Sequence, residues 1–278
     1  GTTIDGRVLG WGNNEYGQLG LGHCYGIFTP TELVPPSSQQ KWKQLRCGGR
    51  HTFGWTDDMT LYSWGWNGFG QLGIGRKTEV ENSPVLMNDK FIDIVCGSDH
   101  SFGITEENTL FTWGWNWYGQ LGLGHCDHQR TPQPLKLPFD DKYQLYCGGT
   151  SSFAVLNSGQ LFSWGGNGNG KLGVGDTSDR NVPVEVTLPS HVKCVKLFCG
   201  YNHFLMKTST NDIYGWGWNI YGQLGLRHTD DILSPVLMNG FSFNTIVCGW
   251  NHSFGITDGT VYAWGWNGCG QYGNDTIE

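Results

Sequence analysis

The stretch LFTWGWNWYGQLGLGH, residues 110–125, places three tryptophans within five positions and follows them with a glycine-rich segment. Its Trp-Gly pair recurs every 48 to 53 residues, and the six pairs begin at residues 11, 64, 113, 164, 216 and 264. A Cys-Gly pair keeps the same period and begins at residues 47, 96, 147, 199 and 248. Two independent markers with one period identify a repeat protein.

Each repeat contains short runs that alternate as β-strands do. In HSFGIT, residues 100–105, larger side chains alternate with small or polar ones, and LFTWG, residues 110–114, has aromatic rings at alternate positions. FIDIV, residues 91–95, precedes a Cys-Gly pair, and PVLM, residues 84–87, begins with a proline, which belongs at the start or edge of a strand. The sequence therefore predicts four short strands per repeat and no long helix.

Four-stranded units of this length pack as the blades of a β-propeller. We therefore predict an all-β chain that forms one propeller domain over residues 1–278, with about six repeat units visible. The glycines of GQLGLG, residues 119–124, are expected to adopt positive φ and to let the backbone pass close to the next blade. The first tryptophan of each pair is expected to fill the space between blades; these structural residues are Trp11, Trp64, Trp113, Trp164, Trp216 and Trp264.

Composition limits the classes of function. The net charge is −7, which argues against direct nucleic-acid binding, because such binding depends on Lys and Arg neutralising phosphates. No apolar run approaches the roughly 20 residues of a membrane helix, and the first residues show no signal-peptide pattern. Five of the nine cysteines occupy one repeated position, which favours reduced thiols over a disulfide framework. We expect an intracellular protein, cytoplasmic or nuclear, that does not bind membranes.

Repeated histidines stand four residues after their cysteines, and Ser151 takes this place in the repeat of Cys147. Ligands on different blades would spread around a ring, so we interpret these histidines as buried donors to nearby backbone rather than as metal or catalytic residues. HCDH, residues 125–128, lacks the paired spacing of a zinc site. We predict no catalytic, metal or cofactor site, and a chain that is not an enzyme. The four histidines are His51, His100, His203 and His252.

The pattern CGSDHSFGIT…LFTWGWNWYGQLGLGH is similar to that of the regulator of chromosome condensation repeat family, and its marks recur across nearly the entire chain. The resemblance implies a β-propeller, usually of seven blades, with the strand order Cys-Gly, His, Trp-Gly and Pro from the axis outward. On that order the chain runs through four whole blades between two partial units. The ring is then either incomplete or closed by pairing of the N- and C-terminal strands.

Two sets of positions vary while the framework repeats. Residues two and three after each cysteine fall in the turn after the first strand, and we expect them to line one mouth of the channel and bind a partner protein. The residues after each Trp-Gly include Trp66 and Trp115, which either join that face or only extend the packing between blades. One repeat departs from the pattern at Ser151, Gly166, Asn169 and Lys171. The predicted partner-binding residues are Arg50, Asp99, Thr150, Tyr201, Asn202, Trp250 and Asn251.

The leading functional hypothesis is a platform for protein partners. The resemblance implies two alternatives, guanine-nucleotide exchange on a small GTPase and ultraviolet-B light sensing. Exchange in the family is attributed partly to a projecting wedge, yet the spacings from Trp-Gly to the next Cys-Gly vary only from 32 to 36 residues and leave no obvious extra hairpin. The light-sensing motif G-W-R-H-T is split here, because CGGRHT, residues 47–52, lacks the tryptophan and CGWNHS, residues 248–253, lacks the arginine.

Overall fold

The computed structural model describes residues 1–273, and the chain divides into two compact units. Unit 1 comprises Gly1–Trp117 and Cys126–Lys136, and unit 2 comprises Tyr118–His125 and Leu137–Glu278. The single domain over residues 1–278 stays a prediction, and its last positions, 274–278, lie outside the described residues.

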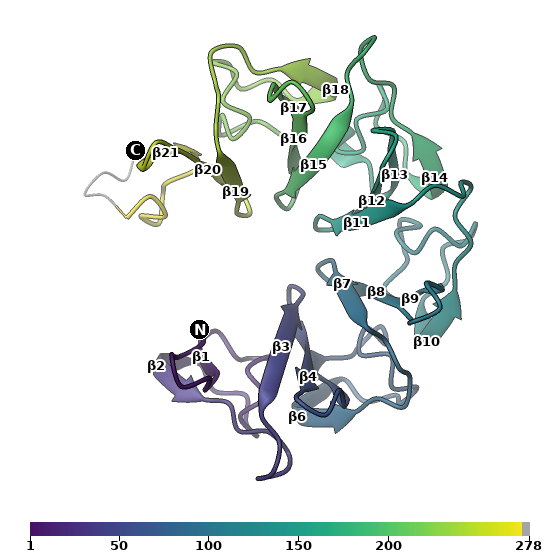
Figure 1. Cartoon of the computed structure of the whole chain (residues 1–278), viewed down its shortest axis with the longest axis vertical. Helices are drawn as coiled ribbons and strands as arrows, with labels where there is room; N and C mark the ends of the chain where they lie inside the picture. The colour runs from purple at the N-terminus through teal and green to yellow at the C-terminus, as the bar shows by residue number, and fades with distance from the viewer. Residues whose placement is uncertain (274–278) are drawn as a thin grey trace. The chain divides into compact units, whose positions relative to one another are not determined.

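Unit 1 contains three antiparallel sheets (Figure 1). The first has two strands, β1 (Leu9–Gly12) and β2 (Ile27–Glu32). The second has the order β3 (Trp42–Cys47), β4 (His51–Thr56), β5 (Leu61–Trp66) and β6 (Val80–Leu86). The third has the order β7 (Asp93–Cys96), β8 (His100–Ile104), β9 (Leu110–Gly114) and β10 (Gln129–Pro134).

Unit 2 also contains three sheets. The first has the order β11 (Tyr143–Cys147), β12 (Ser151–Leu156), β13 (Leu161–Gly165) and β14 (Arg180–Glu185). The second has the order β15 (Cys194–Cys199), β16 (His203–Thr208), β17 (Ile213–Gly217) and β18 (Ile232–Leu237). The third has three strands, β19 (Thr245–Cys248), β20 (His252–Thr257) and β21 (Thr260–Gly265).

These sheets are blades of an all-β propeller, as predicted. In each four-stranded sheet the strands follow the predicted order, with the Cys-Gly strand first and the proline-containing strand last. Within residues 1–273 there is no α-helix, and the 3-10 helix η1 spans only Gly168–Gly170. Neither six units nor seven blades are established by this fold. All nine cysteines are free thiols.

The proline lies inside the fourth strand rather than at its start. β6 begins at Val80, four residues before Pro84. The register between β5 and β6 pairs Ser63 with Val85 and then Gly65 with Glu81, so Pro84 falls where the ladder is interrupted. The same interruption surrounds Pro132, Pro183 and Pro235. Because a proline has no N–H to donate, the bulge lets it sit in the strand without losing a ladder bond.

The tryptophans of the Trp-Gly pairs are fixed by one backbone acceptor. Trp113 and Trp164 are fully buried, and their indole N–H groups donate to the carbonyls of Gln71 (2.9 Å) and Gln120 (3.0 Å). That carbonyl belongs to the loop after the preceding Trp-Gly strand. Burying one such ring contributes roughly 4–6 kcal/mol of hydrophobic free energy. Equivalent bonds join Trp64 to Gln18, Trp216 to Lys171 and Trp264 to Gln223.

Trp11 departs from the expected packing. It lies in β1 and is 51% exposed, whereas Trp64, Trp113, Trp164 and Trp216 have no exposed surface. Trp264 is half-buried. The space-filling role predicted for Trp11 is therefore wrong in this structure, because β1 is the first strand of the described residues and no loop after an earlier Trp-Gly strand supplies its packing partner.

The glycines of residues 119–124 adopt the predicted conformation. Gly119, Gly122 and Gly124 have φ values of 77°, 75° and 82°. A Cβ atom on Gly122 would lie 3.0 Å from the indole nitrogen of Trp164. Positive φ and close approach thus both require glycine at this position.

Two of the repeated histidines, His51 and His203, bond to a hydroxyl of the next sheet, and backbone hydrogen bonds with Ser98 and Trp250, respectively, also act on their pKa values. His51 Nε2 lies 3.0 Å from Ser101 Oγ, and Ser101 Oγ donates to the Gln71 carbonyl at 3.0 Å. Since the serine proton is used in that bond, His51 is the donor to Ser101. His203 and Ser253 repeat the arrangement at 2.9 Å. His100 is also fully buried, and His252 is half-buried.

The divergent repeat replaces this pair on both sides of the contact. A Cβ atom on Gly48 would lie 2.2 Å from the His51 ring, so that ring covers the glycine. The equivalent Gly148 is covered instead by the Phe204 ring, which would lie 2.5 Å from such a Cβ atom. Phe204 takes the place of the serine in the next sheet, and Ser151 takes the place of the histidine. The small side chain, Ser151, thus lies in the sheet where other repeats have the large one, and the large side chain, Phe204, lies where they have the small one.

We predict that Ser151 and Phe204 are energetically coupled. Ser151→His should bring a second ring into the space of Phe204, and Phe204→Ser should open a cavity, each destabilising the fold by about 2–5 kcal/mol. The double variant should restore a histidine–serine pair. Its loss of unfolding free energy should be smaller, by at least about 1 kcal/mol, than the sum of the losses of the two single variants. Urea unfolding of the four proteins measures this cycle, and strictly additive losses would contradict the assignment.

The buried histidines should make stability depend on pH. Burial lowers the pKa of His51 to about 4 and the pKa values of His100 and His203 to about 3. In the unfolded chain a histidine titrates near 6.5, so below that pH the unfolded state binds more protons than the folded state. The buried histidines therefore make their full contribution to the free energy of unfolding above about pH 6.5. That free energy falls as the pH drops toward 4, by about 2 kcal/mol per histidine at pH 5.

Urea unfolding at pH 7.5 and pH 5 tests this prediction. His203→Asn should reduce the difference in unfolding free energy between the two pH values, because one of the three protonation steps is removed. An equal difference in the variant and the wild type would show that His203 does not contribute.

Candidate functional site

The predicted partner-binding residues all lie in the turns between the first and second strands of their sheets, which we call the first turns. Arg50 and Asp99 lie in unit 1, in turns 48–50 and 97–99. The other five lie in unit 2, in turns 148–150, 200–202 and 249–251. These five are Thr150, Tyr201, Asn202, Trp250 and Asn251.

In each unit, the first turns of one pair of consecutive sheets are joined by a backbone hydrogen bond. In unit 1, Gly49 N donates to Ser98 O at 3.0 Å. In unit 2, Gly149 N donates to Tyr201 O at 3.0 Å. Because the bond is made by the main chain, the side chains of the turns remain available for other contacts.

The structure brings the two variable sets of positions together. Trp66 N donates to Arg50 O at 2.8 Å, and Trp115 N donates to Asp99 O at 2.8 Å. In unit 2 the same bond joins Gly166 to Thr150, Trp218 to Asn202 and Trp266 to Asn251. The residue after each Trp-Gly pair therefore lies beside the first turn of its own sheet.

In unit 1, Arg50 and Asp99 have different environments. The Arg50 guanidinium lies 5.1 Å from the Tyr16 ring centroid and 4.9 Å from that of Trp66, a cation–π arrangement. Asp99 is only 8% exposed, and burial raises its pKa to about 6 while the charge of Arg50 acts in the opposite direction. Arg50 is exposed, so it is the accessible charge of this pair.

Aromatic rings continue from Arg50 across unit 1. Tyr16 and Trp66 have ring centroids 5.7 Å apart, and Trp66 and Phe69 have centroids 5.1 Å apart. Phe69 stacks on Trp115 at 5.6 Å with an interplanar angle of 13°. The four rings form a row that is partly exposed.

In unit 2, two of the predicted residues form an aromatic pair. The ring centroids of Tyr201 and Trp250 are 5.1 Å apart, and Trp250 is 68% exposed. Asn202 and Asn251, which follow them in the sequence, are half-buried. Thr150 is 5% exposed and therefore contributes little accessible surface.

A second row of rings lies beside these turns in unit 2. Trp218 and Tyr221 have centroids 5.4 Å apart, and Tyr221 and Trp266 have centroids 6.0 Å apart. Tyr221 and Trp266 are 44% and 36% exposed. Unit 2 thus presents two groups of accessible aromatic rings next to amide side chains.

No role was predicted for Lys171, although this position breaks the repeated pattern. Lys171 is 8% exposed, and its Nζ donates to Thr150 Oγ1 at 2.7 Å and to Asn202 Oδ1 at 3.0 Å. Burial lowers its pKa to about 8, against the opposing charge of Asp179. Lys171 therefore connects two of the predicted binding residues, Thr150 and Asn202, through hydrogen bonds from its ammonium group.

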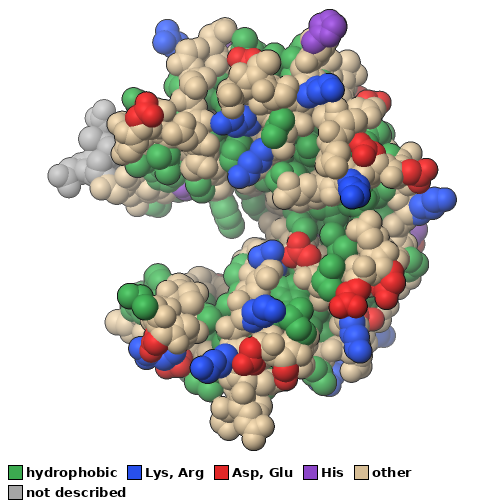
Figure 2. All heavy atoms as spheres, viewed as in Figure 1, with side chains coloured by type: hydrophobic (Ala, Val, Ile, Leu, Met, Phe, Trp, Pro, Cys, Tyr) green, Lys and Arg blue, Asp and Glu red, His purple; other side chains and the backbone are tan. Residues whose placement is uncertain are grey.

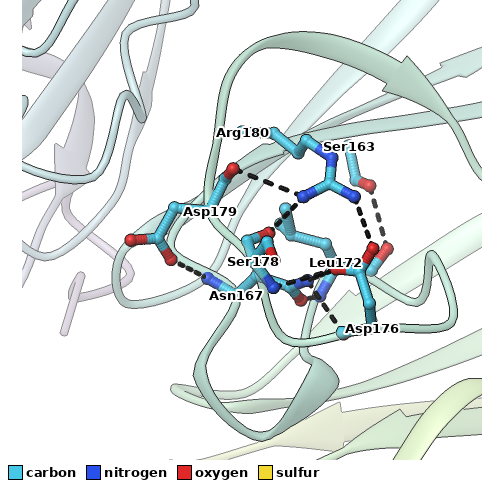
Figure 3. A network of polar contacts seen from close by, with 7 residues as sticks. All are labelled: Ser163, Asn167, Leu172, Asp176, Ser178, Asp179 and Arg180. Atoms are coloured by element: carbon cyan, nitrogen blue, oxygen red, sulfur yellow. Dashed lines mark hydrogen bonds and ion pairs between the residues drawn. The ribbon is translucent and has the colours of Figure 1, made fainter.

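A polar network holds the loop that carries Lys171 (Figure 3). Asn167 Oδ1 accepts from Leu172 N at 2.9 Å, and Asn167 Nδ2 donates to Asp176 O at 2.9 Å. Arg180 pairs with Asp176 at 2.6 Å, and Asp179 Oδ1 accepts from Asn167 N at 2.7 Å. The asparagine recurs three residues after each tryptophan of the Trp-Gly pairs, and no role was predicted for it.

No catalytic or metal-binding constellation is brought together in the part of the chain that the structure describes. Among residues 1–273, no group of three or more His, Cys, Asp and Glu side chains could hold a metal ion. His51 and His203 bond to serines in other sheets, far in sequence from one another. None of the helical residues in that range forms a segment long and apolar enough to cross a membrane.

A family model identifies the repeat. The model described as Regulator of chromosome condensation (RCC1) repeat matches five successive segments, residues 5–55, 60–104, 107–155, 158–206 and 211–256. A second model of the same description matches residues 42–71, 91–120, 194–223 and 243–271. Together the first matches cover most of the chain.

Relatives of known function are larger than this chain. Ultraviolet-B receptor UVR8 of Arabidopsis thaliana is 36% identical over 264 residues, which cover 92% of this chain and 48% of the receptor. Probable E3 ubiquitin-protein ligase HERC4 of Mus musculus is 39% identical over 261 residues, which cover 90% of this chain and 24% of the ligase. The chain therefore spans about half of the first relative and about a quarter of the second.

Solved structures share the fold. Human WBSCR16 has a TM-score of 0.75 at 25% identity, and the match covers 90% of this chain and 67% of that protein. Prp20p of Saccharomyces cerevisiae, whose binding properties to Gsp1p and histones are described with its structure, has a TM-score of 0.59 at 20% identity. That match covers 96% of this chain and 82% of Prp20p, and at this identity it shows the fold alone.

Proposed function

The chain belongs to the Regulator of chromosome condensation (RCC1) repeat family, and from this premise we propose that it is a non-enzymatic platform that binds protein partners through its first turns. Members of the family include a light receptor and ubiquitin ligases. Fold and family therefore leave the partner open, and the proposal has to come from the side chains of this chain.

The observation that carries the proposal is the aromatic pair of the half-buried Tyr201 and the exposed Trp250. Their centroids are 5.1 Å apart, and Trp250 keeps 68% of its surface accessible. Tryptophan and tyrosine dominate the binding energy of protein interfaces when a partner covers them. The neighbouring Asn202 and Asn251 supply polar contacts at the edge of the same surface.

Arg50 extends the proposal to unit 1. Its guanidinium is exposed and is oriented by the rings of Tyr16 and Trp66. An arginine that is already held by aromatic rings loses less conformational entropy when a partner binds it. Arg50 is therefore the residue of unit 1 that we assign to partner binding.

The surface charges favour proteins over nucleic acids as partners. In the view of Figure 2, Lys and Arg side chains alternate with Asp and Glu side chains, and no large basic area is visible. The net charge of −7 agrees with this distribution. We propose an intracellular, non-membrane setting for the same platform, which suits its nine free thiols.

We expect the double variant Tyr201→Ala/Trp250→Ala to lose a partner without losing its fold. Each interface hot spot contributes about 2 kcal/mol or more to binding, whereas exposed side chains contribute less than about 0.5 kcal/mol to folding. Affinity capture from cell lysate, followed by mass spectrometry, compares the partners of the variant and the wild type.

The matched control is Phe28→Ala, which removes an aromatic ring that is 98% exposed on β2 and lies outside the first turns. Its partner list should equal that of the wild type. Identical lists for the wild type and the double variant, at unchanged melting temperature, would refute the placement of the binding surface.

Exchange on a small GTPase is the alternative partner class. Binding to Gsp1p is described for Prp20p, but at 20% identity that likeness extends only to the fold. In residues 1–273 no strand is inserted between the third and fourth strands of any four-stranded sheet. Nothing else in the described part of the chain favours exchange, so we assign it no residue here.

Ultraviolet-B reception is the function of the receptor that is 36% identical to this chain. No first turn here combines the tryptophan and the arginine, since Arg50 follows Gly49 and Trp250 precedes Asn251. We therefore expect no light response. Size-exclusion chromatography with light scattering, before and after ultraviolet-B illumination, should give one unchanged mass, and a change in mass would establish light sensing instead.

The sixth unit remains a proposal that the register supports. β1 pairs with β2 as Gly10 with Thr31 and then Gly12 with Ile27. β5 pairs with β6 through the same shift, from Ser63–Val85 to Gly65–Glu81. We therefore infer that β1 and β2 are the third and fourth strands of a blade.

A further inference from the structure

Lys171 is a buried cation that has only neutral partners. Its Nζ bonds to the hydroxyl of Thr150 and to the side-chain carbonyl of Asn202, at 2.7 and 3.0 Å. These acceptors come from the first turns of two different sheets, before β12 and before β16. An ammonium group has three N–H donors, so these two bonds leave it one more.

No carboxylate neutralises this charge within the described residues. No ion pair of residues 1–273 involves Lys171. Among these residues, the charge of Asp179 acts on the pKa of Lys171 without a direct contact. Burying a charge without a counter-ion is costly, so the lysine at this position calls for an explanation other than stability.

Other repeats place a glutamine here whose side-chain oxygen accepts a hydrogen bond within the loop. Gln71 Oε1 accepts from Phe69 N at 3.0 Å, and Gln223 Oε1 accepts from Tyr221 N at 3.0 Å. A lysine cannot accept a hydrogen bond. Lys171 therefore cannot accept the hydrogen bond from the loop N–H, and its side chain extends toward the first turns instead.

The neighbouring position changes together with the lysine. Where other repeats have Trp66, Trp115 and Trp218, this repeat has Gly166. A Cβ atom on Gly166 would lie 2.6 Å from Thr150 Oγ1 and 3.4 Å from Lys171 Cε. A tryptophan could not occupy this place with Thr150 and Lys171 in their observed positions, so the ring that would lie there is missing.

Aromatic rings lie near the residues that Lys171 contacts. A Cβ atom on Gly149, which precedes Thr150, would lie 2.9 Å from the ring of Tyr201, and that ring packs against Trp250. Because Asn202 Oδ1 is turned toward Lys171, its Nδ2 is a further donor at the same place. The site therefore offers N–H donors beside exposed aromatic rings, which is the chemistry that suits a carboxylate next to an apolar side chain.

We propose that Lys171 binds the carboxylate of an Asp or Glu side chain from a partner protein, while an apolar side chain beside it packs on Tyr201 and Trp250. This proposal rests on the platform function and names the chemistry of its partner. With a net charge of −7 the chain repels broadly acidic surfaces, so the fitting partner is a short segment with an isolated acid. Its carboxylate would also raise the lowered pKa of Lys171.

A random dodecapeptide library displayed on phage, selected on the wild-type protein, tests the proposal. The enriched peptides should share an Asp or Glu beside an apolar residue. A synthetic peptide of the enriched sequence should bind Lys171→Gln at least about tenfold more weakly than the wild type, because a charge-assisted bond is lost. Replacing the acid of the peptide by its amide should cause the same loss, and the two changes together should cost little more than either one.

Lys171→Gln restores the residue that other repeats carry, so its melting temperature should not fall. Lys142→Gln is the matched control, since it removes one positive charge from an exposed site of unit 2 and should leave peptide binding unchanged. A selection that enriches no acid-containing peptide, or equal affinity of Lys171→Gln and the wild type, overturns the proposal. If Tyr201→Ala/Trp250→Ala still loses its cellular partner in that case, the platform function stands without the carboxylate site.

Discussion

Within each unit, one backbone carbonyl per repeat ties neighbouring sheets together. The carbonyl of Gln71 accepts both the indole N–H of Trp113 and the hydroxyl of Ser101, and Gln223 serves Trp264 and Ser253 in the same way. A buried indole N–H needs an acceptor, so the tryptophan can fill its space only where the preceding loop presents that carbonyl. The repeated asparagine holds the loop in place, since Asn67 Oδ1 accepts from Leu72 N directly after Gln71. The loop, the tryptophan ring and the strand that carries the serine hydroxyl are thus positioned together. The first turns directly precede such strands, so their positions depend on the same contacts.

Much of this fold could be predicted from the sequence, because it is encoded by local patterns. The four strands of a repeat and the positive φ of Gly119, Gly122 and Gly124 follow from periodicity and residue type, whereas the order of the strands follows from the resemblance to the repeat family. Contacts between repeats were not accessible in this way. The acceptor of His51 is a serine 50 residues away, and the exposure of Trp11 depends on which strands surround β1. The turn positions of the candidate site could be predicted from the sequence. The small exposed fraction of Thr150 and the contacts of Lys171 could not, because they depend on packing between sheets.

The divergent repeat shows how such a coupled system changes. Ser151 and Phe204 differ from the pattern on opposite sides of one contact, and Gly166 and Lys171 differ side by side. In each pair the two substitutions depend on one another, because the space that one side chain fills must be left empty by the other. What remains constant is the main-chain acceptor, since Lys171 O still receives the indole of Trp216 at 3.0 Å. The side chain at this position is therefore free to serve another purpose.

The prolines inside the fourth strands also bear on how the molecule behaves at high concentration. An outermost strand offers unpaired N–H and C=O groups to any other chain, and a long flat edge invites aggregation. Pro84 and its counterparts remove a donor at the point where the bulge already bends the strand. Intermolecular strand addition would meet an interrupted ladder there. The fourth strands therefore present an interrupted edge to other chains.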